Sequence, residues 1–130
     1  MTLLLDTCTL IWFFTGHRRI EDRLRDVLTD PQHDLRMSDV SILELVIKHQ
    51  LGRLGWKQSP SRILPVLARK HGVNSYPLTA EVIFRLEQLP LLHRDPFDRL
   101  LVAQAMCTGS VLVTPDPLIQ QYPIKTLWKV

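Results

Sequence analysis

The heptapeptide HRDPFDR at residues 93–99 places two aspartates three positions apart, directly before the apolar run LLVAQAM. Asp95 precedes a proline, and Asp98 falls in the first turn of the helix that this pattern predicts. Carboxylates at a helix start satisfy free backbone N–H groups and face the positive end of the helix dipole. Carboxylates that converge from several elements can instead hold a divalent cation. Which of these applies depends on whether other acids reach the same place.

Three further acids are expected at that place. Asp6 ends the apolar run TLLLD, Asp116 ends SVLVTPD, and Glu44 lies in the helix predicted after the short strand DLRMS. Strand ends and the helix starts beside them meet at one edge of a parallel sheet. Two carboxylates ~4 Å apart repel by about 4 kcal/mol at an effective dielectric of 20. A cluster of Asp6, Glu44, Asp98 and Asp116 therefore needs protons or a cation, and oxygen ligands alone suit Mg²⁺ or Mn²⁺.

Each acid also has a local structural explanation. Asp6 can cap the helix that follows it, and Ser41 with Glu44 matches the S-x-x-E capping box. Asp95 and Asp116 each precede a proline, which is a common helix start. A cap contributes only ~1 kcal/mol, yet it explains one acid well. Caps explain the acids singly, but they do not explain the convergence of all of them.

Apolar strands and amphipathic helices alternate along the 130 residues. This alternation predicts one α/β domain, residues 1–130, with a parallel sheet and right-handed crossovers. The expected strands are 2–6, 34–38, 74–78, 110–116 and 124–130. The expected helices are 7–14, 20–30, 40–52, 62–72, 79–90 and 96–109, and Pro65 must lie in the first turn of its helix or kink it.

Composition narrows the class of protein. Apolar residues make up 45% of the chain, which argues against disorder, and no apolar run reaches the ~20 residues needed to cross a bilayer. Cys8 and Cys107 form no metal-binding spacing, so we expect reduced thiols in a cytoplasmic protein without a zinc site. The formal charge of +3 and the pI of about 9.1 mildly favour a polyanionic partner.

Four stretches resemble, in order, the PIN-domain nucleases: LLLDTCTLIWF, SDVSILELVIKHQLGRL, LTAEVIFRLEQLPLLHRDPFDRLLVAQA and VLVTPDPLI. Within that family the chain is most similar to the VapC-type toxins of bacterial toxin–antitoxin pairs. The resemblance implies a three-layer α/β/α sandwich around a mostly parallel sheet of about five strands. It also implies a metal-dependent endoribonuclease that hydrolyses RNA phosphodiester bonds with Mg²⁺ or Mn²⁺.

The resemblance also implies roles for individual residues. Asp6, Glu44 and Asp98 match the core metal-binding acids, and Asp116 matches a fourth acid that varies more in the family. Supporting positions are Asp95, as a cap or outer neighbour, and the hydroxyls Thr7 and Thr114. Arg94 and Arg99 flank the expected site and are candidates for contact with RNA phosphates. His93 receives no role, because water activated by a metal makes a general base unnecessary.

The family further implies three partners: an RNA substrate, a cognate antitoxin protein and a second copy of the chain. The consecutive residues Trp12, Phe13 and Phe14 cannot all face one core, so at least one should be exposed or covered by a partner. The alternative hypothesis is a catalytically inactive PIN-like module that only binds a protein or RNA. Retention of all four acids argues against that alternative.

Overall fold

The computed structural model describes all 130 residues and contains one five-stranded sheet with every strand pair parallel. The strands are β1 (Thr2–Leu5), β2 (Asp34–Ser38), β3 (Val73–Tyr76), β4 (Val111–Val113) and β5 (Thr126–Leu127). Their order in the sheet is β3-β2-β1-β4-β5. From β1 the chain adds β2 and then β3 on one side, and it later adds β4 and then β5 on the other side of β1. The switch point lies between β1 and β4, where open α/β sheets bind their ligands.

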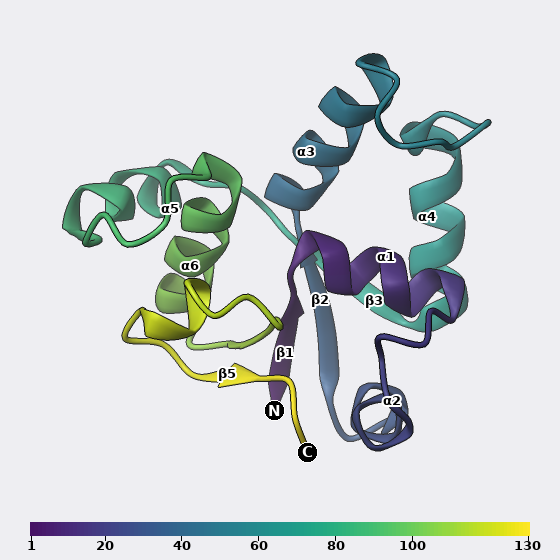
Figure 1. Cartoon of the computed structure of the whole chain (residues 1–130), viewed down its shortest axis with the longest axis horizontal. Coiled ribbons are helices and arrows are strands. Elements are labelled where there is room, and N and C mark those ends of the chain that lie inside the picture. The colour runs from purple at the N-terminus through teal and green to yellow at the C-terminus, as the bar shows by residue number, and fades with distance from the viewer.

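Helices cover both faces of the sheet. The elements are α1 (Thr7–Thr15), α2 (Asp22–Thr29), α3 (Asp39–Gln50), α4 (Pro60–His71), α5 (Ala80–Arg85), the 3₁₀ turn η1 (Leu86–Gln88), α6 (Pro96–Thr108) and the 3₁₀ turn η2 (Ile119–Gln121). Helices α1, α2 and α4 lie on one side of the strands, and α5 and α6 lie on the other (Figure 1). The predicted α/β/α sandwich with a parallel sheet is confirmed.

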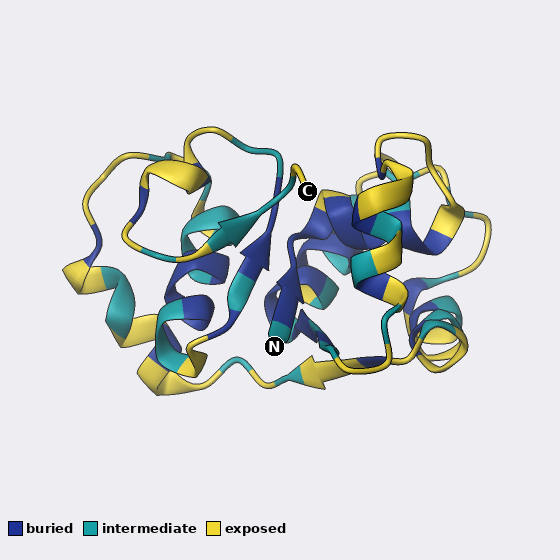
Figure 2. Ribbon diagram, turned by 90° about the horizontal axis from the view of Figure 1, so that it is seen from below, coloured by how far each residue is buried: buried dark blue, intermediate teal, exposed yellow.

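The alternation of β1 supplies both cores. Leu3 and Leu5 point into the cluster formed with α1, α2 and α4, whereas Leu4 points into the cluster formed with α6. Successive strand residues face opposite sides, so a strand covered on both faces is apolar throughout. The central strands β1, β2 and β4 and the inward faces of the helices form most of the buried part of the molecule (Figure 2). Both layers therefore hold β1, and the residue that follows it, in a rigid position.

The aromatic run on α1 divides between the core and the C-terminus. Phe13 and Phe14 are buried, and Trp12 is half-buried. The Trp12 ring lies 5.9 Å from the ring of Trp128, and the Arg19 guanidinium lies 4.7 Å from the Trp12 centroid. The residue expected outside the core is thus covered by this chain's own segments.

Several boundaries differ from the sequence predictions. The helix predicted to begin at residue 62 begins at Pro60, because Ser59 and Pro60 form a favourable start, and Pro65 consequently lies beyond the first turn. The helix predicted over 79–90 ends at Arg85 and tightens into η1. The last strand spans only Thr126–Leu127, at the edge of the sheet. None of the helices combines the length and the apolar character needed to span a bilayer.

Candidate metal centre

Asp6 leaves β1 directly at the switch point. Its Oδ1 accepts a hydrogen bond of 2.8 Å from the backbone N–H of Thr9, so the side chain caps α1. The residue is only 5% exposed. One oxygen is therefore held by the first turn of α1, and the carboxylate is fixed at the carboxyl end of the central strand.

Asp116 lies beyond β4, in a turn rather than in the strand where the sequence placed it. The backbone N–H of Asp116 donates to Oγ1 of Thr114 over 3.1 Å, and the backbone N–H of Leu118 donates to Oδ1 of Asp116 over 2.8 Å. These bonds end β4 at Val113 and direct the chain into η2. Thr114 itself is fully buried. The fourth acid is thus held at the same edge as Asp6.

The capping box proposed for Ser41 and Glu44 is wrong. Helix α3 begins at Asp39, and its cap is Ser38, whose Oγ accepts from the N–H of Val40 over 3.0 Å. Strand β2 runs through Ser38, so the chain passes from strand to helix without a loop. Ser41 is already inside the helix, and Glu44 lies further along it. The Glu44 carboxylate therefore has no part in the cap.

Glu44 instead carries the least satisfied group of the site. Its Oε2 lies 2.7 Å from Nζ of Lys48, one turn further along α3. Its Oε1 is buried and has no hydrogen-bond partner. A buried polar atom that lacks a partner costs free energy unless a ligand supplies one. This orphaned oxygen fits a site for a hard cation that binds oxygen ligands.

The motif HRDPFDR, residues 93–99, positions two more carboxylates at the start of α6. Oδ1 of Asp95 accepts from the backbone N–H groups of Phe97, over 2.8 Å, and of Asp98, over 3.5 Å. Asp95 is therefore the N-cap, and Asp98 projects from the first turn. The motif thus both starts the helix and presents a carboxylate.

His93, for which we expected no role, lies beside two of these acids. Its Nε2 lies 3.1 Å from Oδ2 of Asp98 and 2.9 Å from Oδ2 of Asp116. His93, Asp98 and Asp116 each bring one potential ligand atom to within 4.8 Å of the others. The one signal in the sequence for this position is that His93 comes two residues before Asp95, the N-cap of α6. Its contact with Asp116 spans 23 residues and depends on the tertiary fold.

The pKa values show that the acids share one electrostatic environment. The pKa of Asp98 is raised to about 7, first by burial and then by the negative charge of Asp95; the charges of Glu44 and Asp6 act in the same direction, and His93 opposes them. Burial also raises the pKa of Asp6, against hydrogen bonds from Thr114 and Thr9, while the charge of Asp116 adds to the increase. Asp6, Glu44 and Asp98 thus lie near enough to influence one another's charge, but only Asp98 and Asp116, with His93, bring ligand atoms within 4.8 Å of one another. A shared metal site for Asp6, Glu44, Asp98 and Asp116 stays a prediction.

The raised pKa of Asp98 predicts a pH-dependent stability of the metal-free protein. Its folded pKa of about 7 exceeds the ordinary 3.8, so the folded state keeps a proton that the unfolded state releases as the pH rises from about 4 to 7. The contribution of Asp98 to the free energy of unfolding should therefore fall across that window. Asp98→Asn should then be more stable than wild type at pH 8, by on the order of 1 kcal/mol after solvent screening, and should lose that advantage near pH 4.

Urea unfolding in EDTA at both pH values measures this difference. Asp26→Asn, on the exposed face of α2, is the matched control and should show no such pH-dependent gain. An advantage of Asp98→Asn that is the same at pH 4 and pH 8 would show that Asp98 does not retain its proton.

The remaining predicted positions are more peripheral. The Thr7 hydroxyl lies 2.9 Å from the Ser41 hydroxyl and joins α1 to α3 rather than contacting a carboxylate. Arg94 is exposed beside the acids. The Arg99 guanidinium turns back, and its Nη2 donates to the carbonyl of Leu86 over 3.4 Å. Contact of either arginine with RNA stays a prediction.

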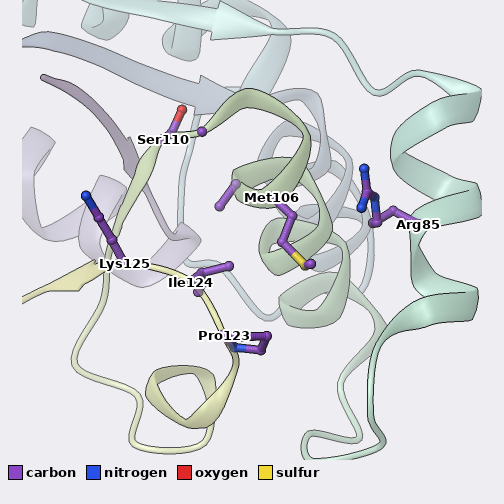
Figure 3. Close-up of a pocket in the computed structure, with 8 residues that line it drawn as sticks. Arg85, Met106, Ser110, Pro123, Ile124 and Lys125 are labelled. Atoms are coloured by element: carbon purple, nitrogen blue, oxygen red, sulfur yellow. The ribbon is translucent and has the colours of Figure 1, made fainter.

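A cavity of about 310 Å³ lies elsewhere, at the edge where β4 begins. Its lining is Arg85, Ala105, Met106, Gly109, Ser110, Pro123, Ile124 and Lys125. Figure 3 shows Arg85 and Lys125 on opposite sides of it. Ser110 precedes β4, whereas the acids follow the strands, so this cavity takes no part in their chemistry.

Comparisons with known proteins agree with this geometry. The family profile of the PIN domain matches residues 3–125. The fold is similar to the VapBC2 complex of Rickettsia felis bound to a promoter DNA fragment, with a TM-score of 0.74, 16% identity and 98% of both chains covered. DNA-bound VapBC of Salmonella typhimurium gives a TM-score of 0.66 at 18% identity, with 98% and 97% of the two chains covered. Utp24, a PIN domain endonuclease, gives 0.51 at 19% identity, with 92% and 74% covered. Among curated proteins no sequence match is found.

Proposed function

We propose, because the chain belongs to the PIN-domain family, that it is a divalent-metal-dependent endoribonuclease that hydrolyses RNA phosphodiester bonds. The observation that carries this proposal is the orphaned, buried Oε1 of Glu44, a carboxylate whose charge also raises the pKa of Asp98. Lys48 is the only lysine paired with any of these acids. One ammonium does not balance four carboxylates, so the site suits a divalent cation.

In this proposal Asp6, Glu44 and Asp98 hold Mg²⁺ or Mn²⁺, and Asp116 lies beside them. A bound divalent cation activates the attacking water and neutralises the charge that develops on the phosphate. The chain's own part is to hold the oxygens in place before substrate arrives. The first turn of α1 holds Asp6, and Lys48 holds one oxygen of Glu44.

We further propose that the chain is the toxin of a toxin–antitoxin pair, because two of the similar solved structures are VapBC complexes. An antitoxin protein and a second copy of the chain would then be its protein partners, in the cytoplasm. Exposed apolar side chains support a protein partner: Phe84 on α5 is 65% exposed, and Leu91, before α6, is 84% exposed.

Cleavage of total cellular RNA by purified, antitoxin-free protein tests the proposal. Cutting should require Mg²⁺ or Mn²⁺, stop in EDTA and be lost in Asp98→Asn, which also controls for contaminating nucleases. If the wild type cuts no RNA with either metal, the nuclease proposal fails and a PIN-like module that only binds a partner becomes the better account.

A further inference from the structure

The carboxylate oxygens of the site are not equally available. Oε1 of Glu44 has no partner, and Oδ1 of Asp98 receives no hydrogen bond, whereas Oδ2 of Asp98 contacts His93. Both oxygens of Asp116 are engaged: Oδ1 accepts from the N–H of Leu118, and Oδ2 lies 2.9 Å from Nε2 of His93. Asp116 is therefore less free than Asp98 to bind an ion directly, because the N–H of Leu118 also occupies its second oxygen.

The tautomer of His93 follows from its second nitrogen. The backbone N–H of Asp95 lies 3.1 Å from Nδ1 of His93. A backbone N–H can only donate, so Nδ1 is the acceptor, and the ring proton of the neutral imidazole is on Nε2. That proton is directed to Oδ2 of Asp116, which accepts the hydrogen bond over 2.9 Å, while Oδ2 of Asp98 lies beside it, 3.1 Å from Nε2. The side chain is 12% exposed, so the protein fixes its orientation.

This arrangement is the reverse of the one found at metal-binding histidines. A histidine that binds a metal donates its other ring N–H to a carbonyl or carboxylate, which leaves the binding nitrogen unprotonated. Here the other nitrogen accepts a hydrogen bond instead. His93 is thus oriented to donate a hydrogen bond to a carboxylate and not to bind a metal. Its Nε2 nevertheless lies within 4.8 Å of ligand atoms of Asp98 and Asp116.

We propose that His93 is a positioning residue whose Nε2–H, fixed by the N–H of Asp95, holds Oδ2 of Asp116 and keeps it beside Oδ2 of Asp98. It leaves Oδ1 of Asp98 free to bind the divalent ion together with Asp6 and Glu44, and it keeps Asp116 outside the direct ligands. This inference rests on the proposed metal-dependent function. It adds that three of the acids bind the ion directly while Asp116 does not, and that His93 keeps Asp116 in place.

Two spectroscopic measurements test the tautomer and the absence of ligation. In the metal-free protein, ¹⁵N shifts of the His93 ring should identify Nε2 as protonated and Nδ1 as unprotonated. In the Mn²⁺-loaded protein, electron spin echo modulation should show no directly coordinated imidazole nitrogen. A protonated Nδ1 with a bare Nε2, or nitrogen coupling to Mn²⁺ that His93→Gln removes, would overturn the proposal.

Calorimetric titration with Mn²⁺ tests the positioning role. His93→Leu removes the donor and should weaken Mn²⁺ binding by roughly 10- to 100-fold, as loss of an outer hydrogen-bond partner does. His93→Gln keeps an N–H donor at the same distance along the side chain and should retain most of the affinity. Asp116→Asn should weaken binding less than Asp98→Asn. Thermal unfolding of each variant confirms that it folds.

The outcomes separate this inference from the proposed function. If the wild type binds Mn²⁺ and His93→Leu binds it equally well, His93 has no positioning role and the metal-dependent function stands. If the wild type binds no Mn²⁺ at the acids, the proposed function fails together with the role of His93 in metal binding, and the ¹⁵N shifts then test only the tautomer.

Discussion

Asp6→Asn is expected to reduce RNA cleavage by on the order of a thousandfold or more, because residues that act as one unit cannot replace each other's charge. The substitution is nearly isosteric, and asparagine is as good an N-cap as aspartate, so the hydrogen bond from Thr9 and the start of α1 should survive. The loss should therefore appear in single-turnover cleavage rates and not in the fraction of folded protein.

The matched control is Asp26→Asn, which removes one charge from the exposed face of α2. It should cleave RNA at the wild-type rate. Substantial cleavage by a folded Asp6→Asn protein would remove Asp6 from the metal site and reduce it to a helix cap.

The second large effect concerns stability. A ligand that binds only the folded state stabilises it by about 2.7 kcal/mol at 100 times its dissociation constant, so Mn²⁺ should raise the unfolding temperature markedly at pH 8. Glu44→Gln should abolish this increase, because it removes the charge at the orphaned buried oxygen. The increase should also shrink below pH 7, since Asp98, with a pKa of about 7, must release its proton before it binds the ion.

Thermal unfolding at pH 6 and pH 8, with and without Mn²⁺, measures both effects. Glu87→Gln, an exposed substitution in η1, is the control and should respond to Mn²⁺ as the wild type does. An equal response of Glu44→Gln would place the stabilising ion elsewhere on the molecule.

Much of the arrangement could be predicted from the sequence, because general rules govern it. The apolar run of β1 is typical of a strand covered on both faces, and Asp95, Pro96 and Gly109 mark both ends of α6. The rule that parallel strands end at one edge then brings Asp6 and Asp98 together. The Glu44–Lys48 pair follows from helical spacing.

Other features depend on choices that local sequence leaves open. Ser38 and Ser41 are both suitable caps, and Ser38 is used because β2 runs directly into α3. The hydrogen bond between His93 and Asp116 forms only because the chain turns after β4 and brings Asp116 next to His93. Pairwise spacing carries no signal for a contact between separate loops. The hydrogen bonds around the acids therefore could not be predicted from the sequence, because they join loops that are distant along the chain.

Crystals grown with Mn²⁺ would test the central claim most directly, through the anomalous scattering of the ion. We predict a manganese peak bound by carboxylate oxygens of Asp6, Glu44 and Asp98, with Oε1 of Glu44 among the ligands. Ordered crystals at saturating Mn²⁺ with no anomalous peak beside these acids would contradict it, and the acids would then be helix caps and ion-pair partners only.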